Sequence, residues 1–235
     1  WDLRAGRRLG RREGVGPPRE LVVVRGACAA LEPAGRVVEL STSGASTLVR
    51  DGATALAADR GDLLVVRGGD VVRIARGGQR TVVRSGVGQG VVAVLQIPGG
   101  ELVLGYREGN LELLAGKRRL LAQDVPSARP LRLIPGPLRT AVAGYGNGLV
   151  GLWDLDTGRR LHHGRLHGPV VHLALRSGTL LAGSELGDHL DWDLRHLTAP
   201  YCELLREVWA DVPVVWRGGR ARLAPAPPAH SCRED

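Results

Sequence analysis

Short apolar runs, each ended by glycine or proline, follow one another along most of the chain. The run Val91–Ile97 is followed by a turn and by Leu102–Tyr106, and the run Val170–Leu175 by a turn and by Thr179–Ser184. A third run and a more polar segment, such as residues 159–163, complete each stretch. Short runs that are rich in valine and leucine and bounded by turn residues predict β-strands.

The same arrangement repeats at a fixed interval. GYREGNLELLA starts at Gly105, GYGNGLVGLWD at Gly144 and GSELGDHLDWD at Gly183, so successive starts are 39 residues apart. Less exact copies start at Asp62 and Arg19. Four short strands in every ~40 residues are the signature of a β-propeller blade. The sequence therefore predicts an all-β propeller of four-stranded antiparallel blades.

We expect about five blades in residues 1–198. Their approximate bounds are 19–50, 51–84, 85–122, 123–163 and 164–198. The chain opens on Trp1-Asp2, and WDLRAGRRL at its start repeats WDLDTGRRL at 153–161. Because the chain opens partway through such a unit, we expect an incomplete ring, with one or two blades preceding residue 1 in a longer protein.

The segment Asn147–Asp154 (NGLVGLWD) resembles the repeat of the WD-repeat (WD40) family, with a turn Asn, a Gly, alternating strand residues and a final Trp-Asp. The blade-motif residues that this resemblance implies are Trp153, Asp154, His167, Ser184, Trp192 and Asp193. A large flat ring at the tryptophan position would fill the wedge between neighbouring blades. The resemblance also implies a protein-interaction platform, which in bacteria is often joined to a kinase, a protease or an NTPase, and we expect a bacterial source.

The units also depart from the family pattern. Leu114, Ile74 and Leu40 stand at or near the tryptophan position of three units, and Leu186 replaces the turn Asp of the last one. We therefore expect the family's buried hydrogen-bond network to be incomplete in every blade. Blade stability then depends mainly on apolar packing.

The repeat stops after His196. Residues 199–223 predict a helix from about Pro200 to Trp209, N-capped by Thr198, and then a hairpin around Gly218-Gly219. We expect this unit to cap the last blade, held there by Trp209 and Trp216, with a docking surface for a partner domain as the alternative. We expect residues 224–235 to form a disordered tail.

Composition adds limits on function. The net charge is +8 and Lys117 is the only lysine; the arginines are spread along the chain, which makes nucleic-acid binding the weaker interpretation. No apolar stretch is long enough for a membrane helix, and no signal peptide is recognisable. Because Cys28, Cys202 and Cys232 form no paired motif, we expect no disulfide, with Cys28 in the core and a cytoplasmic location.

Candidate catalytic and metal-binding groups are sparse. The residues His162, His163 and His167 lack the spacing of a zinc site. GVGQGV at 86–91 precedes a strand rather than a helix, so it is not a phosphate loop. Asp188, His189 and Asp191 fit turn and strand-edge roles better than acid–base catalysis. We therefore expect no metal, no cofactor and no enzymatic activity in this chain.

The remaining functional hypothesis is binding through one face of the propeller. We expect the loops 67–70, 106–110, 145–148 and 184–188 to share a face. Its candidate partner-binding residues are Tyr106, Arg107, Tyr145, Asn147 and Glu185, because aromatic residues and arginine are common in binding hot spots. For the two tyrosines, packing between blades is the alternative. The partner would be a protein or another domain of the same polypeptide; alternatively the chain is the regulatory or substrate-recruiting domain of a larger enzyme.

Overall fold

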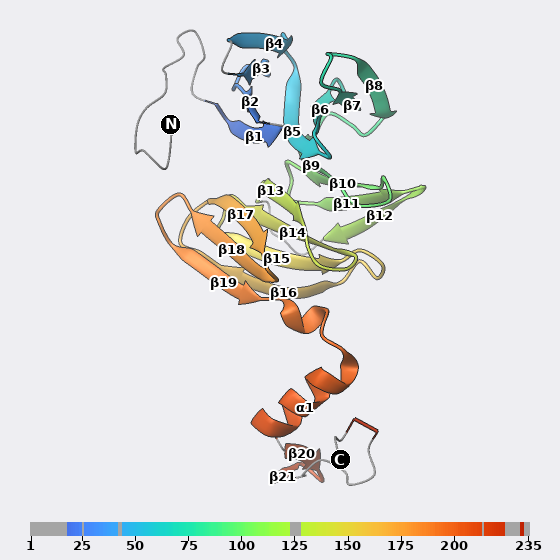
Figure 1. The fold of residues 1–235 in the computed structure, drawn as a ribbon, viewed down its shortest axis with the longest axis vertical. Helices are drawn as coiled ribbons and strands as arrows, with labels where there is room; N and C mark the ends of the chain where they lie inside the picture. Colours follow the sequence, from blue (N-terminus) through green and yellow to red (C-terminus); the bar gives the residue numbers. More distant parts are fainter. Residues whose placement is uncertain are drawn as a thin grey trace.

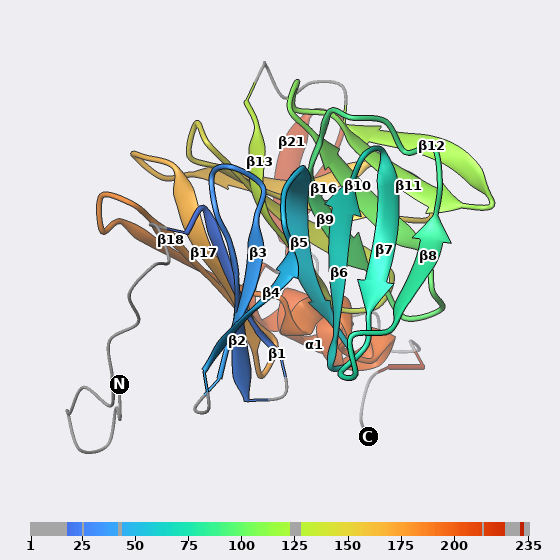
Figure 2. The same ribbon diagram turned by 90° about the horizontal axis from the view of Figure 1, so that it is seen from above.

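The computed structural model describes residues 18–24, 26–41, 44–122, 128–212, 214–223 and 231–232. Five of its sheets are antiparallel blades, each made of strands that are consecutive in the sequence, and they are arranged as a propeller (Figure 1; Figure 2). The predicted all-β propeller fold is therefore confirmed. The predicted blades upstream of residue 1 stay a prediction.

The blades follow the order of the sequence. Blade 1 contains β1 (Glu20–Val24), β2 (Ala27–Leu31), β3 (Val37–Leu40) and β4 (Ala45–Val49). Blade 2 contains β5 (Ala53–Asp59), β6 (Asp62–Arg67), β7 (Asp70–Ile74) and β8 (Arg80–Arg84). Blade 3 contains β9 (Val91–Gln96), β10 (Leu102–Tyr106), β11 (Leu111–Ala115) and β12 (Lys117–Ala122). Blade 4 contains β13 (Pro130–Pro135), β14 (Thr140–Tyr145), β15 (Leu149–Asp154) and β16 (Arg160–Arg165). Blade 5 contains β17 (Val170–Arg176), β18 (Thr179–Ser184) and β19 (His189–Asp193).

The first strand of every blade is the innermost one. Strands β1, β5, β9, β13 and β17 contribute residues to the wall of a common central channel with a volume of about 480 Å³. Consecutive inner strands pack against each other, from β1 on β5 to β13 on β17. The wall of the channel is thus formed by the first strand of each sequence repeat.

The apolar core is divided into four layers, one between each pair of successive blades. The layer between blades 3 and 4 holds the two largest fully buried side chains, Trp153 and Tyr145. Burial of apolar surface at about 25 cal/mol per Å² is the main source of stability in such layers. Each blade is therefore stabilised chiefly by its neighbours.

Blade 5 differs from the prediction, because its sheet has three strands among the described residues. The sequence after Asp193 forms a short 3-10 helix, η1 (Arg195–Leu197), in place of the expected turn into a fourth strand. The carboxylate of Asp193 accepts hydrogen bonds from the backbone amide and the guanidinium of Arg195 at 2.9 Å each. These local bonds close the turn that leads into η1.

The predicted C-terminal helix and hairpin are present. Helix α1 spans Tyr201–Asp211, and the hairpin consists of β20 (Val214–Arg217) and β21 (Arg220–Leu223). Thr198 is not the N-cap as predicted, because its hydroxyl bonds to the carbonyl oxygen of Arg195 and the helix begins after Pro200.

The predicted cap on the last blade is wrong in its placement. Helix α1 has no buried residue, Trp209 is only half-buried, and the helix and hairpin project away from the blades (Figure 1). The side chain of Trp216 and most of the predicted tail, residues 224–230 and 233–235, lie outside the described residues. An amphipathic pattern such as this one predicts a helix without identifying the surface that it packs on.

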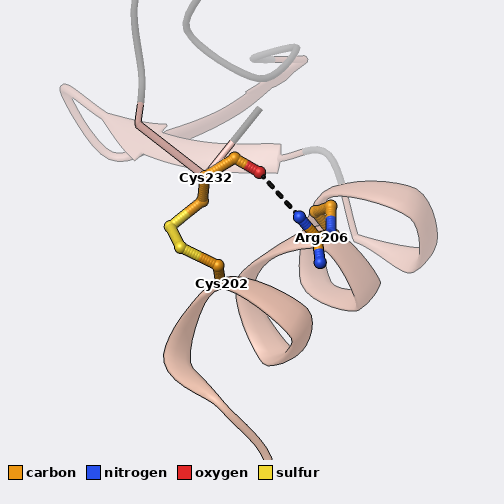
Figure 3. Close-up of a disulfide and its surroundings, with 3 residues drawn as sticks. All are labelled: Cys202, Arg206 and Cys232. Atoms are coloured by element: carbon orange, nitrogen blue, oxygen red, sulfur yellow. Dashed lines mark hydrogen bonds between the residues drawn. A yellow bond between two sulfur atoms is a disulfide. The ribbon is translucent and has the colours of Figure 1, made fainter. Parts of the chain in front are cut away.

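The cysteines also differ from the prediction. Cys202 on α1 forms a disulfide with Cys232, with their Cα atoms 4.8 Å apart, and Arg206 donates a hydrogen bond to the carbonyl oxygen of Cys232 at 3.2 Å (Figure 3). The two are 30 residues apart in the sequence, and only the folded hairpin unit brings them together. Cys28 lies on β2 partly exposed and is not a core residue. Cysteine usage therefore gives no support for a reducing cytoplasm.

Candidate binding face at the channel mouth

The turns between the second and third strands lie at one end of the propeller, and we call this end the turn face. In three places such a turn is bonded to the loop that enters the next blade. The bonds run from the backbone amide of Ala53 to Gly35, of Val87 to Gly69 and of Leu166 to Gly148, at 3.0, 2.8 and 2.9 Å. At Gly148, with φ of 84°, a Cβ would lie 2.1 Å from the carbonyl oxygen of Leu166. Glycine is therefore required where the turn touches the next blade.

The inner strands of blades 2 to 5 each carry a β-bulge where they reach the turn face. The pairing shifts by one residue near the start of β5, β9, β13 and β17. The additional residues are Thr54, Val92, Leu131 and Val171. A bulged residue leaves the regular ladder and redirects neighbouring side chains. The repeat thus places four local irregularities around the mouth of the channel.

Two arginines bond to the carbonyl groups at these bulges. Arg19, which precedes β1, donates from Nη2 to the carbonyl oxygen of Thr54. Arg132 on β13 donates from Nε to the carbonyl oxygen of Val171 at 2.9 Å and from Nη1 to that of Leu131 at 2.7 Å. The bulges therefore hold two guanidinium groups at the channel mouth.

Two further arginines lie close by and are exposed. Arg129 precedes β13, and Arg107 is in the turn between β10 and β11. Neither guanidinium has a hydrogen bond or an ion pair with a residue in the part of the chain that the structure describes. Burial lowers the pKa of Arg19, and the positive charges of Arg129 and Arg107 lower it further. The mouth of the channel is thus a crowded positive region.

Glu20, the first residue of β1, is the acidic member of this region. Its Oε2 accepts a hydrogen bond from the backbone amide of Leu56 at 3.2 Å. Burial raises the pKa of the Glu20 carboxyl to about 7, although the charge of Arg132 opposes the shift. No ion pair joins Glu20 to an arginine among the described residues. A carboxyl group at the mouth therefore changes its charge near neutral pH.

Four charged residues of this region were not predicted from the sequence, namely Arg19, Glu20, Arg129 and Arg132. A usable signal was present, because RELVVV and RPLRLI each place charged residues directly at the start of an inner-strand run. In a propeller this position always lies at one rim of the channel. The bulges that fix the arginines have no recognisable sequence signature.

The two tyrosines predicted to bind a partner are packed between blades, so that prediction is corrected. Tyr145 is fully buried, and its ring lies 6.0 Å from that of Trp153. Tyr106 is half-buried, with its hydroxyl 2.9 Å from the carbonyl oxygen of Val87 and 2.7 Å from Glu112 Oε2. Burial and the bond to Glu112 raise the pKa of Tyr106. Both residues end a second strand, where the adjoining blade covers the side chain.

The other three predicted partner-binding residues reach the surface of the turn face to different extents. Arg107 and Glu185 are exposed. Asn147 is half-buried, and its Oδ1 accepts a hydrogen bond from the backbone amide of Leu149 at 3.1 Å, which is a turn-forming role. Arg107 and Glu185 are therefore the members of the predicted set that are available to a partner.

The Trp-Asp pairs occupy equivalent places in two blades. Trp153 is fully buried in the layer between blades 3 and 4, while Trp192 is half-buried and meets the ring of His162 at 4.6 Å. Asp154 Oδ1 accepts a hydrogen bond from the backbone amide of Asp156 at 2.8 Å. Asp193 Oδ1 accepts the equivalent hydrogen bond from the backbone amide of Arg195. The tryptophans pack between blades, and the aspartates close the turn that follows the third strand.

The polar contact expected to be missing from blade 5 is present in another form. Asp188 Oδ2 accepts a hydrogen bond from the backbone amide of His167 at 3.0 Å. The same oxygen lies 3.4 Å from His167 Nδ1 and 3.4 Å from Ser184 Oγ. Leu186 occupies the turn position where the repeat pattern has an Asp, and Asp188 provides the carboxylate in its place. His167 and Ser184 both contact Asp188 rather than each other, so this set contains no nucleophile paired with a base.

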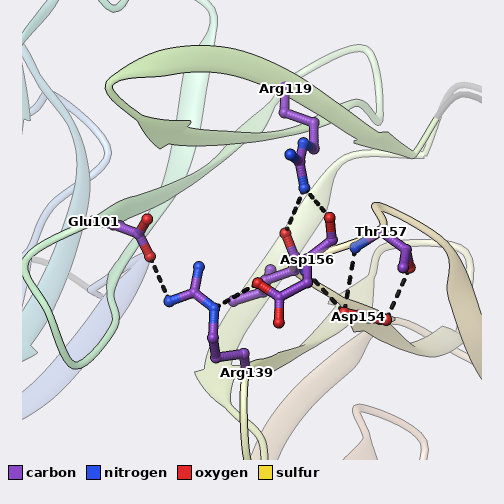
Figure 4. A network of polar contacts seen from close by, with 7 residues as sticks. Glu101, Arg119, Arg139, Asp154, Asp156 and Thr157 are labelled. Carbon is purple, nitrogen blue, oxygen red and sulfur yellow. Dashed lines mark hydrogen bonds and ion pairs between the residues drawn. The ribbon is translucent and has the colours of Figure 1, made fainter.

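A second polar network lies at the opposite end of the propeller. Arg139 of blade 4 contacts Glu101 of blade 3 at 2.8 Å and Asp156 at 2.7 Å, and Arg119 of blade 3 donates to the carbonyl oxygens of Leu155 and Asp156 (Figure 4). The Arg139–Glu101 ion pair and the bonds of Arg119 join blades 3 and 4, whereas the Arg139–Asp156 ion pair lies within blade 4. This network is best explained as structural.

The described residues hold no arrangement of three or more His, Cys, Asp or Glu side chains suited to a metal ion. Within the same part of the chain, no helix has the length and apolar character needed to span a membrane. The chemistry that this surface can perform is the recognition of charge, centred on the arginines and Glu20.

No protein-family model matches the sequence, and no curated protein is similar to it. Among solved structures, the chain is similar to the computationally designed Ika8 protein, with 18% identity and a TM-score of 0.53 over 74% of this chain and 57% of that chain. It is also similar to the β-propeller domain of Cps50 (Swd1) from Myceliophteria thermophila, with 17% identity and a TM-score of 0.56 over 78% of this chain and 68% of that domain. The chain thus spans less than two thirds of the designed protein, and these similarities establish the propeller fold alone.

Proposed function

We propose that this chain is a non-catalytic binding module that holds a partner protein, or another domain of the same polypeptide, on its turn face. The observation that carries the proposal is the group of arginines at the channel mouth, two of them held by bulges and two exposed without a described partner. Arginine is enriched in binding hot spots, and loops on a rigid scaffold are frequent binding surfaces.

The proposal assigns no reaction to the chain. The polar groups that lie together, such as Asp188 with Ser184, satisfy each other within turns. If the complete protein contains a catalytic domain, the same face would recruit a substrate or regulate that domain. In either case the function of this chain is recognition.

Site-specific photo-crosslinking tests the proposal. A photoreactive amino acid replaces Arg107 on the turn face, or Arg76 as a matched control. Arg76 is also exposed, but it lies in the turn between β7 and β8, at the opposite end of the strands. In cells of the source organism we expect a discrete cross-linked protein from position 107 and not from position 76.

The turn face is not the binding surface if position 107 yields no adduct, or if both positions yield the same set of adducts. An intramolecular cross-link to another domain of the complete polypeptide supports the second form of the proposal. Thermal unfolding of both substituted proteins should match that of the unmodified chain, because neither side chain is buried.

A further inference from the structure

A small cavity opens at the centre of the turn face. It has a volume of about 140 Å³, and its charged lining residues are Arg19, Glu20, Arg129, Arg132 and Glu185. Apolar residues of the inner strands, including Val92 and Val171, complete the wall. The cavity therefore has room for one side chain and presents both charge and apolar surface to it.

The charges of the cavity favour an anion. Three arginines face two glutamates, which leaves one net positive charge when both carboxylates are ionised. Arginine binds a carboxylate well because its planar fork can donate two parallel hydrogen bonds.

The cavity is also organised before any ligand arrives. Arg19 and Arg132 are held by backbone carbonyl groups, whereas Arg129 is exposed and has no described hydrogen-bond partner. Groups fixed in advance lose little conformational freedom on binding. Arg129 can therefore close over a bound anion while the other two arginines stay in place.

We propose that this cavity takes the carboxylate of an acidic side chain from a partner protein, with Glu20 making the interaction dependent on pH. The inference rests on the function proposed above and specifies the chemistry of the partner. The charged and titratable groups around Glu20 are Arg19, Arg129 and Arg132, with Glu185 and His172 on the side of blade 5.

The direction of the pH dependence follows from the charge of Glu20. Its carboxyl has a pKa of about 7, so it is largely neutral at pH 6 and largely ionised at pH 8. A neutral Glu20 can donate a hydrogen bond to the incoming carboxylate, while an ionised one repels it. Binding is therefore stronger at pH 6 than at pH 8.

The test uses a labelled synthetic peptide in which glutamate alternates with glycine, and its affinity is measured by fluorescence anisotropy. A peptide with glutamine in place of glutamate and a short oligothymidylate are the comparison ligands. We expect Arg129→Gln to weaken binding of the glutamate peptide about tenfold or more, the size expected for losing a charge-assisted hydrogen bond. Arg76→Gln removes the same charge at the opposite end of the strands and should change affinity less than twofold.

The pH profile supplies the second measurement. We expect the unmodified chain to bind the glutamate peptide more tightly at pH 6 than at pH 8, and Glu20→Gln to bind equally at both values. Gln retains an oxygen that can accept the bond from the Leu56 amide. Melting curves of each variant establish that the fold is retained.

Several results would overturn the inference. These are equal losses from Arg129→Gln and Arg76→Gln, tighter binding of oligothymidylate, no measurable binding of the glutamate peptide at millimolar concentration, and an unchanged pH profile in Glu20→Gln. If a partner still cross-links to position 107 in any of these cases, the turn face remains the binding surface and only its chemistry is wrong. If cross-linking fails as well, the proposed function fails with it.

Discussion

Blades 4 and 5 carry the same motif in different surroundings. Trp153 and Trp192 occupy equivalent positions, yet the first is fully buried and the second is half-buried. Blade 4 has four strands and an apolar layer on each side, whereas blade 5 has three strands and shares one described layer. The contribution of the motif to stability is therefore determined by the neighbouring blades more than by the motif itself.

Within each Trp-Asp pair, the tryptophan makes contacts between blades and the aspartate makes contacts within its own blade. Trp153 belongs to the layer between blades 3 and 4, but Asp154 closes a turn within its own blade. The corresponding bonds of Asp193 are formed in blade 5, where the described residues form three strands. The aspartate positions should therefore behave alike in both blades, while the tryptophan positions should not.

The largest difference between blades 4 and 5 is expected in the free energy of unfolding lost when each tryptophan is replaced. Trp153→Ala should lower the free energy of unfolding by about 3–5 kcal/mol, the usual cost of truncating a buried aromatic residue. Trp192→Ala should cost roughly 1–2 kcal/mol, because part of its surface already faces solvent. Urea unfolding followed by circular dichroism measures both values, and equal losses would contradict the comparison.

A smaller difference is expected at the turn glycines. Gly148 and Gly187 have φ of 84° and 91°, so alanine is strained at both positions by about 1–3 kcal/mol. A Cβ at Gly148 would also meet the carbonyl oxygen of Leu166, whereas a Cβ at Gly187 has nothing within 4 Å. Gly148→Ala should therefore lower the melting temperature more than Gly187→Ala. The reverse order would show that this contact between blades 4 and 5 is unimportant.

The smallest effects, and the most similar ones, are expected at the aspartates. The hydrogen bond from Thr157 holds the pKa of Asp154 below its usual value, and bonds from Arg195 do the same for Asp193. A lowered pKa stabilises the folded state above the unfolded pKa of about 4, and this contribution is lost as the pH falls through the lower folded value. Asp154→Asn and Asp193→Asn should each lower the melting temperature slightly at pH 7.

The aspartate prediction is checked by melting curves at a series of pH values. The difference between each variant and the unmodified chain should shrink as the pH falls below about 4. A difference that is constant with pH would mean that the carboxylate charge is not involved.

The repeat in the sequence was sufficient to predict the fold, because the 39-residue spacing reports a strand order that each blade can form locally. The channel mouth was less predictable. Arg107 and Glu185 follow from their place in a turn, but Tyr145, which ends the strand before such a turn, is buried by the adjoining blade. The residue pattern of one repeat does not reveal a contact with the adjoining blade.

Other features depended on long-range geometry or on weak signals. Arg19 and Arg132 are held by β-bulges that the alternation of residues does not reveal. The disulfide joins Cys202 and Cys232 across 30 residues of sequence, a pairing that spacing alone does not predict. These are the places where packing, rather than local preference, decides the structure.

The division of the core into four layers has a consequence for how the propeller comes apart. Each layer belongs to two blades, so an internal blade such as blade 3 contributes to two layers, and blade 5 to one of those described. Stability then sums over nearest neighbours, as in a linear array of repeats. Hydrogen exchange should therefore be faster in blades 1 and 5, each of which contributes to one described layer, than in blade 3, which contributes to two.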